Sequence, residues 1–397
     1  MERAKAAHRQ ENSQGFVDPD ILAKIRVGKA YVAAKYGFRN HWYPAFFSHE
    51  LPENGFMTAQ LLGEKILLKR IDGKVYAIRD QCLHRGVPLS RKPECYTRDT
   101  ISCWYHGFTY RFSDGLLCDI VGADESAVIG KKRIKTYPVE EAKGLVFVFV
   151  GDVDYPVPPL AHDVPPKFLD ADMAIRGQKR TVNANWRIGA ENGFDSTHIF
   201  IHKNSILISD NDLALPLGLL PKGRFAFEKL EEVDGPKGVF DNFGPDVIKP
   251  IFTGTVEGEK VLEGTPHGRN MLPHNISMWL PCALRVDPWP DPSLTQFEWY
   301  VPIDGKQHIY IQTLGRRVAN EGEEKQFAME FERRWRPVAL DGFNNDDVWA
   351  REATEDFYAD DKGWLKEQLF EPDGNIIEWR KLASKHNRGI QGPEHIG

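Results

Sequence analysis

The stretch Cys82-Leu-His84-Arg-Gly86, followed after sixteen residues by Cys103-Trp-Tyr-His106-Gly107, decides how the first half of the chain folds. Each segment places a cysteine, a histidine and a glycine in one short loop. Around both loops, short apolar, β-branched and aromatic runs alternate with Asp-Gly turns, a pattern typical of antiparallel strands. The runs are 65–69, 74–78, 100–104, 108–112 and 145–150. The sequence therefore predicts a small antiparallel β domain that carries both loops.

The two loops offer two thiolates and two imidazoles, a donor set that suits zinc or an iron–sulfur cluster. Zinc modules tend to pair Cys with Cys and His with His, whereas here each loop supplies one Cys followed by one His. Mixed loops favour a [2Fe–2S] cluster in which Cys82 and Cys103 hold one iron and His84 and His106 hold the other, as in Rieske centres. A zinc site, or buried cysteines beside ordinary histidines, is the alternative.

Composition excludes several classes of protein. The chain has 397 residues, of which 27% are charged, and a net charge of −6, whereas nucleic-acid binders usually have a basic excess. Its longest apolar stretch, 145–150, has six residues where a membrane span needs about 20. The first twenty residues lack the apolar centre of a signal peptide, and five cysteines are an odd number, so we expect a cytoplasmic protein without a disulfide framework. Cys95, Cys118 and Cys282 are predicted to be small core residues.

Five prolines between 152 and 167 predict an irregular junction between two domains. We place a disordered tail to about residue 20 and a helix at 21–36 in a segment 1–39, which packs on the second domain. The β domain covers 40–155 and the second domain 156–397. A helical stretch near 186–202, strands at 276–280 and 297–301, and a mostly helical 321–388 predict an α+β second domain, an antiparallel sheet covered by helices.

A second set of polar residues lies in the segment 191–202. Helical spacing places Glu191, Asp195, His198 and His202 on one stripe among large apolar residues, and buried polar groups need partners. Two imidazoles and one carboxylate form the facial triad that leaves open positions on non-haem Fe(II). The metalloprotease pattern needs Glu directly after the first His, where this chain has Ile199. The third ligand must come from elsewhere, and the segment 344–352 offers Asp346 and Asp347, between which composition does not choose.

These motifs identify a resemblance. The chain is similar, over nearly its whole length, to the oxygenase components of the Rieske non-haem iron aromatic-ring hydroxylases, and most similar to members that oxidise carbazole. Besides the Cys/His loops and the Asp195-x-x-His198-x-x-x-His202 pattern, the stretches that carry the resemblance are 37–44, 191–195, 211–218, 296–304 and 342–347. Many relatives have four residues between the two histidines, whereas this chain has three.

The resemblance implies a set of roles. Asp347 is the metal-binding acid, because Glu352 follows it at the family's distance, and it completes an Fe²⁺ site with His198 and His202. Asp195 links His198 to His106 of an adjacent subunit in a head-to-tail homotrimer. The chain has no GxGxxG fingerprint after a strand, so NADH electrons are expected to arrive through a separate NAD(P)H-dependent reductase and a ferredoxin. Arg85, Arg91, Lys92 and Arg98 are candidates for docking an acidic ferredoxin.

For the substrate, the resemblance implies a flat tricyclic heteroaromatic in an apolar cavity, dioxygenated at adjacent ring carbons with both atoms of O2. The expected walls are Ile199, Ile276, Leu284, Val286, Trp289 and Phe343, with Gln296 nearby and the Gly193 carbonyl accepting a ring N–H. A monooxygenase or demethylase with the same metals is the rival enzyme. An electron carrier or a zinc-stabilised binding module is the rival from another class.

Overall fold

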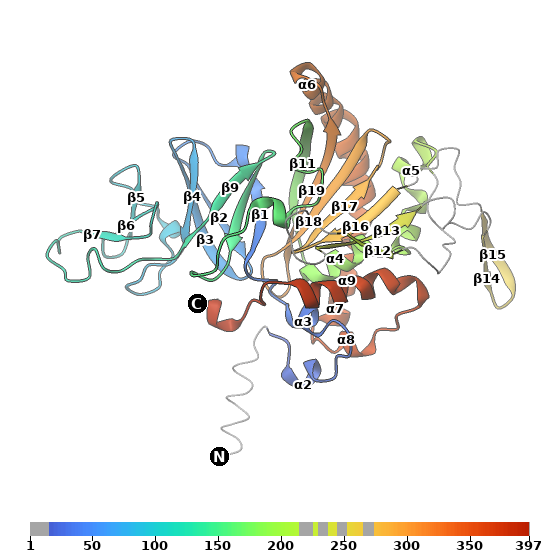
Figure 1. The fold of residues 1–397 in the computed structure, drawn as a ribbon, viewed down its shortest axis with the longest axis horizontal. Helices are drawn as coiled ribbons and strands as arrows, with labels where there is room; N and C mark the ends of the chain where they lie inside the picture. The colour runs from blue at the N-terminus through green and yellow to red at the C-terminus, as the bar shows by residue number, and fades with distance from the viewer. Residues whose placement is uncertain (1–15, 214–224, 229–236, 244–251, 265–273, 397) are drawn as a thin grey trace, which may run out of the picture.

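The computed structural model describes residues 16–213, 225–228, 237–243, 252–264 and 274–396. Two units lie side by side: three small sheets at one end and a seven-stranded sheet with helices at the other (Figure 1). This is the α+β arrangement that the sequence predicts. Residues 1–15 of the expected disordered tail and residues 214–218 of one resembling stretch lie outside the described residues.

The first unit contains the predicted strands, each within two residues of its expected position. Its three sheets have the strand orders β1-β10-β9, β2-β3-β4-β8 and β5-β6-β7, and all pairings are antiparallel. The strands are β1 (His41–Phe47), β2 (Phe56–Leu61), β3 (Glu64–Ile71), β4 (Lys74–Arg79), β5 (Thr100–Ser102), β6 (Phe108–Arg111), β7 (Leu117–Ile120), β8 (Thr136–Tyr137), β9 (Val139–Ala142) and β10 (Leu145–Val150). Every residue of β10 is buried, which explains its uninterrupted apolar run.

The second unit is built on an antiparallel sheet of order β11-β19-β18-β17-β16-β13-β12. Its strands are β11 (Met173–Val182), β12 (Phe225–Glu228), β13 (Gly238–Phe243), β16 (His274–Trp279), β17 (Ala283–Asp287), β18 (Leu294–Pro302) and β19 (His308–Arg317). A separate hairpin consists of β14 (Phe252–Val256) and β15 (Glu259–Gly264). All nine residues of β18 are buried, so this central strand has packed elements on both faces.

Helices cover this sheet as expected, and most lie in the last third of the chain (Figure 1). They are α4 (Trp186–Phe194), α5 (Ile206–Asp210), α6 (Glu321–Glu330), a π-helical segment (Phe331–Phe343), α7 (Asn344–Tyr358), α8 (Gly363–Lys366) and α9 (Gly374–His386). Among the described residues, no helix is long and apolar enough to cross a membrane.

The predicted leading helix at 21–36 is wrong as a single element. The chain forms two short helices, α2 (Pro19–Leu22) and α3 (Lys29–Ala33), separated by Gly28 in the left-handed region at φ 71°. A Cβ at Gly28 would lie 2.7 Å from the Cβ of Arg380, so α9 approaches the backbone too closely for another residue. The spacing of the apolar residues predicted a helix here but did not predict the break at Gly28.

The described part of the N-terminal segment contacts the second unit, while the bounds 1–39 stay a prediction. The Tyr31 hydroxyl donates to the Arg187 carbonyl at 3.1 Å, and the Trp186 indole donates to the Ala34 carbonyl at 2.8 Å. In the proline-rich junction the one helical turn is the 3₁₀ segment Leu160–Asp163. The predicted boundary at 155/156 falls inside this junction and stays a prediction.

Glu64 joins three parts of the chain. Its buried carboxylate accepts from Arg39 at 2.7 Å, Lys135 at 2.8 Å and Tyr137 at 2.6 Å, and from Gln391 of the C-terminal segment at 3.4 Å. Burial raises the pKa of Glu64, but Lys135, Tyr137 and Arg39 outweigh that effect and leave the pKa below its ordinary value. The carboxylate is therefore charged and fully paired in the folded chain.

Glu64→Gln is predicted to lower the free energy of unfolding by about 3 kcal/mol at pH 7, because it removes the anion from a buried set of cations. Since the folded-state pKa is depressed, this contribution is complete above the unfolded pKa of about 4.3 and disappears as the pH falls through the folded pKa. Urea unfolding at several pH values measures the difference. Glu141→Gln, which breaks the more exposed pair with Arg70, is the matched control and should cost at most about 1 kcal/mol. Equal losses in both variants would contradict the assignment.

Candidate metal centres and substrate cavity

The two Cys/His loops have the same backbone architecture. In the first, the amide of Gly86 donates to the Cys82 carbonyl at 2.9 Å; in the second, the amide of Gly107 donates to the Cys103 carbonyl at 2.9 Å. Both glycines have positive φ, 70° and 69°, so each loop can turn back on its cysteine. The equal spacing from Cys to Gly in the two sequence segments therefore reflects the same type of turn in both loops.

These loops hold the four donors as two pairs. Cys82 and Cys103 are buried, whereas His84 and His106 are exposed and their Nδ1 atoms lie 3.1 Å apart. The four donors do not form a compact group with all atoms within 4.8 Å of one another, the arrangement that a single tetrahedral zinc would need. A buried sulfur pair and a separate pair of facing imidazole nitrogens fit a two-iron cluster better.

The second candidate centre is built where α4 ends. Asp195 follows the last residue of α4 with an extended ψ of 123°, and its Oδ1 accepts from the amide and hydroxyl of Thr197 at 2.6 and 2.8 Å. A 3₁₀ helix then begins at His198 and runs to Asn204. The Asp195 carbonyl accepts from His198 Nδ1 at 2.5 Å, so in the neutral ring Nε2 is the nitrogen that can bind a metal.

Asp347, in the first turn of α7, meets both histidines. Its Oδ1 lies 3.3 Å from His198 Nε2 and 3.3 Å from His202 Nε2, and the three ligand atoms lie within 4.8 Å of one another. Asp346 lies on the other side of the ring, with Oδ2 3.3 Å from His202 Nδ1. Composition could not choose between these two adjacent acids. In the structure Asp347 faces both histidine Nε2 atoms, and Asp346 faces only Nδ1 of His202.

The centre fits a cation. His202 Nε2 and Asp347 Oδ1 are buried and have no hydrogen-bond partner within the described part of the chain. Burial raises the pKa of Asp347, but the imidazoles of His202 and His198 outweigh it and hold that pKa well below its usual range. Two imidazoles and one carboxylate with orphaned atoms facing one point form the donor set of a non-haem Fe(II) site.

The predicted stripe of four polar residues on one helix is wrong. The helix is interrupted at Asp195 because that residue caps α4 and its side chain bonds to Thr197. Glu191, the first member of the stripe, forms a two-pronged ion pair with Arg380 of α9 at 2.8 and 2.7 Å. Glu191 therefore holds α4 against α9 and does not face the metal centre.

A cavity opens beside His198 and Asp347. All eight predicted pocket residues line it: Gly193, Ile199, Ile276, Leu284, Val286, Trp289, Gln296 and Phe343. Ile276, Val286 and Gln296 are neighbours across β16, β17 and β18, so the sheet forms one wall. Phe343 forms part of the opposite wall, flat against the His202 ring with centroids 3.6 Å apart.

Gly193 is required where α4 crosses the sheet. A Cβ at this position would lie 1.8 Å from the Tyr300 hydroxyl on β18, so any other residue would push the helix away. Gly193 also lies in the last turn of α4, where backbone carbonyls lack partners within the helix.

Three polar residues of the cavity were missed by the sequence reasoning: Glu298, Asn344 and Arg351. Glu298 follows Gln296 at the period-two spacing of one sheet face, and Asn344 and Arg351 follow the Asp347 face of α7. These spacings were a usable signal, because they extend from residues already assigned to the site.

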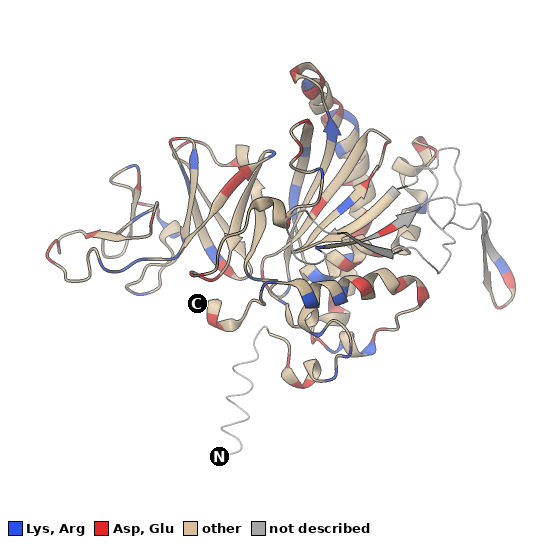
Figure 2. Ribbon diagram, in the orientation of Figure 1, with Lys and Arg blue, Asp and Glu red and all other residues tan. Residues whose placement is uncertain are grey.

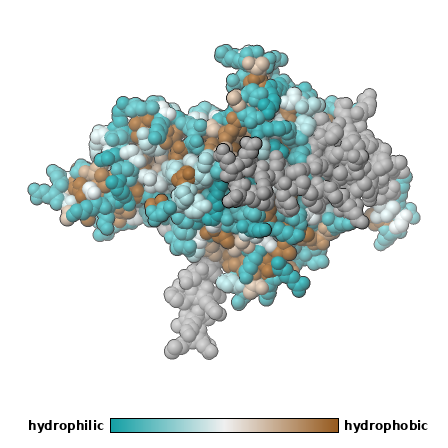
Figure 3. Space-filling model, viewed as in Figure 1, coloured by the Kyte–Doolittle hydropathy of each residue, from teal (hydrophilic) through white to brown (hydrophobic). Residues whose placement is uncertain are grey.

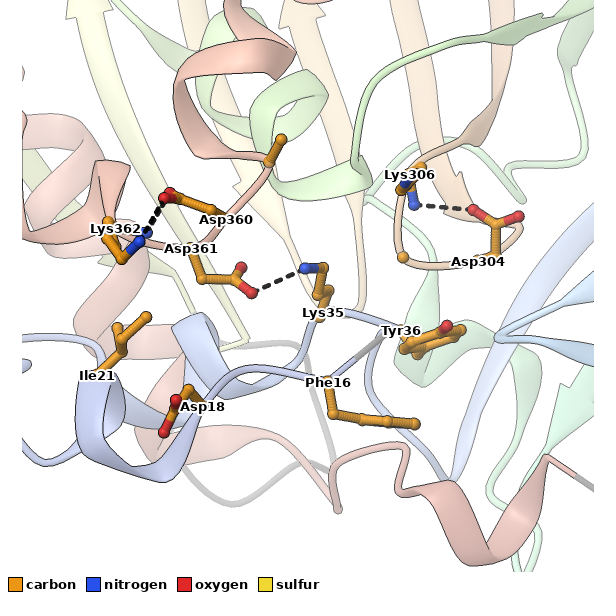
Figure 4. Close-up of a pocket in the computed structure, with 12 residues that line it drawn as sticks. Phe16, Asp18, Ile21, Lys35, Tyr36, Asp304, Lys306, Asp360, Asp361 and Lys362 are labelled. Carbon is orange, nitrogen blue, oxygen red and sulfur yellow. Dashed lines mark hydrogen bonds and ion pairs between the residues drawn. The ribbon is translucent and has the colours of Figure 1, made fainter. Parts of the chain in front are cut away.

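A larger hollow lies elsewhere, between the N-terminal segment, the β18–β19 turn and the α7–α8 connection (Figure 4). Its charged side chains pair locally: Lys35 with Asp361 at 2.8 Å, and Lys362 with Asp360 at 2.9 Å. No histidine or cysteine lies among its described lining residues. Its described residues offer no metal donor set, so the smaller cavity beside His198 is the candidate active site.

Comparison with known proteins matches both halves of the chain. The description "Rieske [2Fe-2S] domain" applies to residues 41–138 and "Homotrimeric ring hydroxylase" to residues 149–391. The carbazole 1,9a-dioxygenase terminal oxygenase component CarAa of Metapseudomonas resinovorans is 55% identical over 383 residues, which are 96% of this chain and 99% of that protein.

Solved oxygenase–ferredoxin complexes of carbazole 1,9a-dioxygenase have the same fold. A fluorene-bound complex, with one phenylalanine replaced by tryptophan, has a TM-score of 0.91 at 55% identity and covers 96% of this chain and 99% of its own. Two carbazole-bound complexes, with a glutamine replaced by tyrosine or an isoleucine by valine, have TM-scores of 0.91 and 0.90 at 54% identity, and cover 96% of this chain and 97% and 98% of their own. The replaced isoleucine, phenylalanine and glutamine are separated by 13 and 7 positions. This chain therefore belongs to the homotrimeric ring hydroxylases that carry a Rieske [2Fe–2S] domain.

Proposed function

We propose that this chain is the terminal oxygenase component of a multicomponent Rieske dioxygenase and that it adds both atoms of O2 to a tricyclic heteroaromatic, with carbazole as the first candidate. The observation that carries the proposal is the buried set His198, His202 and Asp347, which opens onto an apolar cavity. Addition at the carbon bearing nitrogen and at its neighbour takes up O2, two electrons and two protons. The resulting hemiaminal then opens at its C–N bond to an aminobiphenyl-diol.

In this proposal Cys82, Cys103, His84 and His106 hold the cluster, and His198, His202 and Asp347 hold the ferrous ion. When bound, the cluster supplies single electrons and the ion binds and activates O2. The chain's own residues orient the parts: the Asp195 carbonyl fixes the His198 tautomer, and Asp346 faces the other nitrogen of His202. The apolar walls exclude water, and the Gly193 carbonyl accepts the ring N–H of the substrate.

The homotrimer is part of the proposal, with Asp195 linking His198 to His106 of the partner subunit. Asp195 Oδ1 is used by Thr197, which leaves Oδ2 to accept from another group. In a head-to-tail trimer the cluster end of one subunit would meet the metal-centre end of the next, and exposed apolar side chains lie at both ends. Leu83 and Tyr105 lie beside the cluster histidines, and Phe200 and Trp349 lie beside the metal centre. Figure 3 shows apolar surface at the end of the molecule that carries β5–β7.

Electrons are proposed to come from NADH through a separate reductase and a ferredoxin. Basic and acidic residues are interspersed along the described part of both units (Figure 2). Of the four candidate basic residues, Lys92 and Arg98 form ion pairs with Glu94 and Asp72, whereas Arg85 is exposed beside His84. Arg85 and the likewise exposed Arg91 are therefore the local candidates. The free thiols in the chain agree with a cytoplasmic location.

The cavity walls support a tricyclic substrate. Ile276, Trp289 and Gln296 are separated by 13 and 7 positions, the spacing of the three residues replaced in the solved complexes. Trp289 thus corresponds to the phenylalanine position that is replaced by tryptophan in the fluorene-bound complex. The cavity has a volume of about 40 Å³, which is smaller than a tricyclic ring, so its walls are expected to move apart when such a substrate enters.

Oxygen labelling tests the reaction. With ferredoxin, reductase and NADH, carbazole oxidised under ¹⁸O2 is expected to give an aminobiphenyl-diol with two labelled oxygens. One labelled oxygen would instead support the monooxygenase or demethylase reading. The absence of any oxidised product from a chain with full metal content would refute the substrate assignment.

Asp347→Asn is predicted to abolish the mononuclear site and leave the cluster intact, because the amide cannot replace the anionic ligand. The expected result is loss of the ferrous–nitric oxide EPR signal with unchanged visible absorption of the cluster. Asp346→Asn is the adjacent control: it should keep the signal but weaken iron affinity by about 10- to 100-fold, since that acid only orients His202. The ligand assignment would be reversed if Asp346→Asn lost the signal and Asp347→Asn kept it.

Asp195→Asn is predicted to keep both metal sites and lose most turnover, because the amide changes the hydrogen bond proposed between subunits. Metal analysis and steady-state product formation on the trimer measure the two effects separately. Turnover at the parental rate would show that Asp195 is not the link.

A further inference from the structure

Arg351 is a buried cation whose two terminal nitrogens have no hydrogen-bond partner in the described part of the chain. It lies on α7, is 1% exposed and lines the cavity beside Asp347. Its Nε donates to Asn192 Oδ1 at 2.6 Å. Its Nη1 and Nη2 are buried and have no hydrogen-bond partner within the described ranges. A guanidinium stays charged at any physiological pH, so these donors are costly to bury unless something accepts from them.

Asn344 supplies a matching acceptor on the same face of α7. Asn344, Asp347 and Arg351 are spaced i, i+3 and i+7, so they form one stripe, and long helical side chains lean back toward the N-terminus. The Asn344 Nδ2 donates to Glu298 at 2.6 Å and to the Tyr310 hydroxyl at 2.7 Å. Its Oδ1 is buried and has no partner among the residues that the structure describes.

Glu298, Tyr300 and Tyr310 hold this arrangement in place. None of them bonds to the unpaired nitrogens of Arg351 or to Asn344 Oδ1. The Glu298 carboxylate accepts from Gln296, Tyr300, Tyr310 and Asn344. Because a carboxylate only accepts, the Asn344 amide must turn Nδ2 toward it and Oδ1 away. The Arg351 guanidinium lies over the Tyr310 ring at 4.2 Å from its centroid, which places it on the same side of the network.

Arg351 and Asn344, which carry these two unpaired donors and one unpaired acceptor, are therefore among the residues that line the cavity, beside its apolar walls and the polar residues Gln296 and Glu298. A hydrocarbon or heteroaromatic ring satisfies none of them. A hydroxyl satisfies both kinds, since its oxygen accepts from Arg351 and its proton is donated to Asn344. The stripe also contains Asp347, so these atoms lie on the side of the cavity where the metal site is formed.

We propose that Arg351 and Asn344 form a hydroxyl-binding site that holds the oxygen atoms newly added to the substrate ring. This inference rests on the proposed function, because the diol is its product. The site binds the oxidised ring more tightly than the unoxidised one, which shifts the equilibrium between bound substrate and bound product toward the product.

The test compares two probes that differ by one hydroxyl, 2-hydroxybiphenyl and biphenyl, bound by calorimetry to the reduced holoenzyme without O2. The parent is expected to prefer 2-hydroxybiphenyl by roughly tenfold or more, as a hydrogen bond to a charged donor would give. Arg351→Met should lose that preference and keep its affinity for biphenyl. Arg351→Lys, which retains the charge, should keep part of the preference and decides the matter if the methionine variant does not fold.

Arg316→Met is the matched control. Its guanidinium also lies over an aromatic ring, 4.8 Å from the centroid of Phe327, but Arg316 does not line this cavity. The control should keep the parental preference. A preference that survives in folded Arg351→Met would overturn the proposal, because the metal or another group would then be holding the hydroxyl. A preference lost equally in Arg316→Met would overturn it as well. Neither outcome depends on turnover, so failure of the carbazole assignment would be seen separately.

Discussion

The catalytic half of this protein depends on one buried carboxylate oxygen that faces two imidazole nitrogens. Asp347 Oδ1 lies 3.3 Å from His198 Nε2 and from His202 Nε2 and has no other partner among the described residues. When one carboxylate oxygen and two imidazole nitrogens are buried together, they are stable only if a cation lies between them or a proton is shared among them. The end of α4, the following 3₁₀ helix and the first turn of α7 must therefore be held at fixed positions by the rest of the unit.

The holding contacts come from long-range packing. Arg380 ties α4 to α9 through Glu191, and Arg351 ties α7 to α4 through Asn192. Gly193 lets α4 approach β18 closely enough for its last turn to line the cavity. The antiparallel sheet then supplies a wall whose side chains repeat every second residue, so one row of Ile276, Val286 and Gln296 faces the ligand.

Local patterns were enough to predict part of this architecture. The Cys/His loops and their strands follow from alternation and turn residues, and the three candidate iron ligands follow from residue type together with the family resemblance. The interruption at Asp195 was not predictable from spacing, because it depends on the side chain bonding to Thr197 in place of the next helical turn. Arg351 and Glu298 share a strand or helix face with residues already assigned to the site, but their burial becomes visible only from the packing around them. The break at Gly28 likewise depends on α9, far away in the sequence.

The most direct measurement of the central claim is iron and acid-labile sulfide analysis of the chain purified without oxygen. Two separate iron sites of unlike ligation predict three irons and two sulfides per chain and a coloured protein. A colourless protein that contains zinc alone after reconstitution would contradict the account.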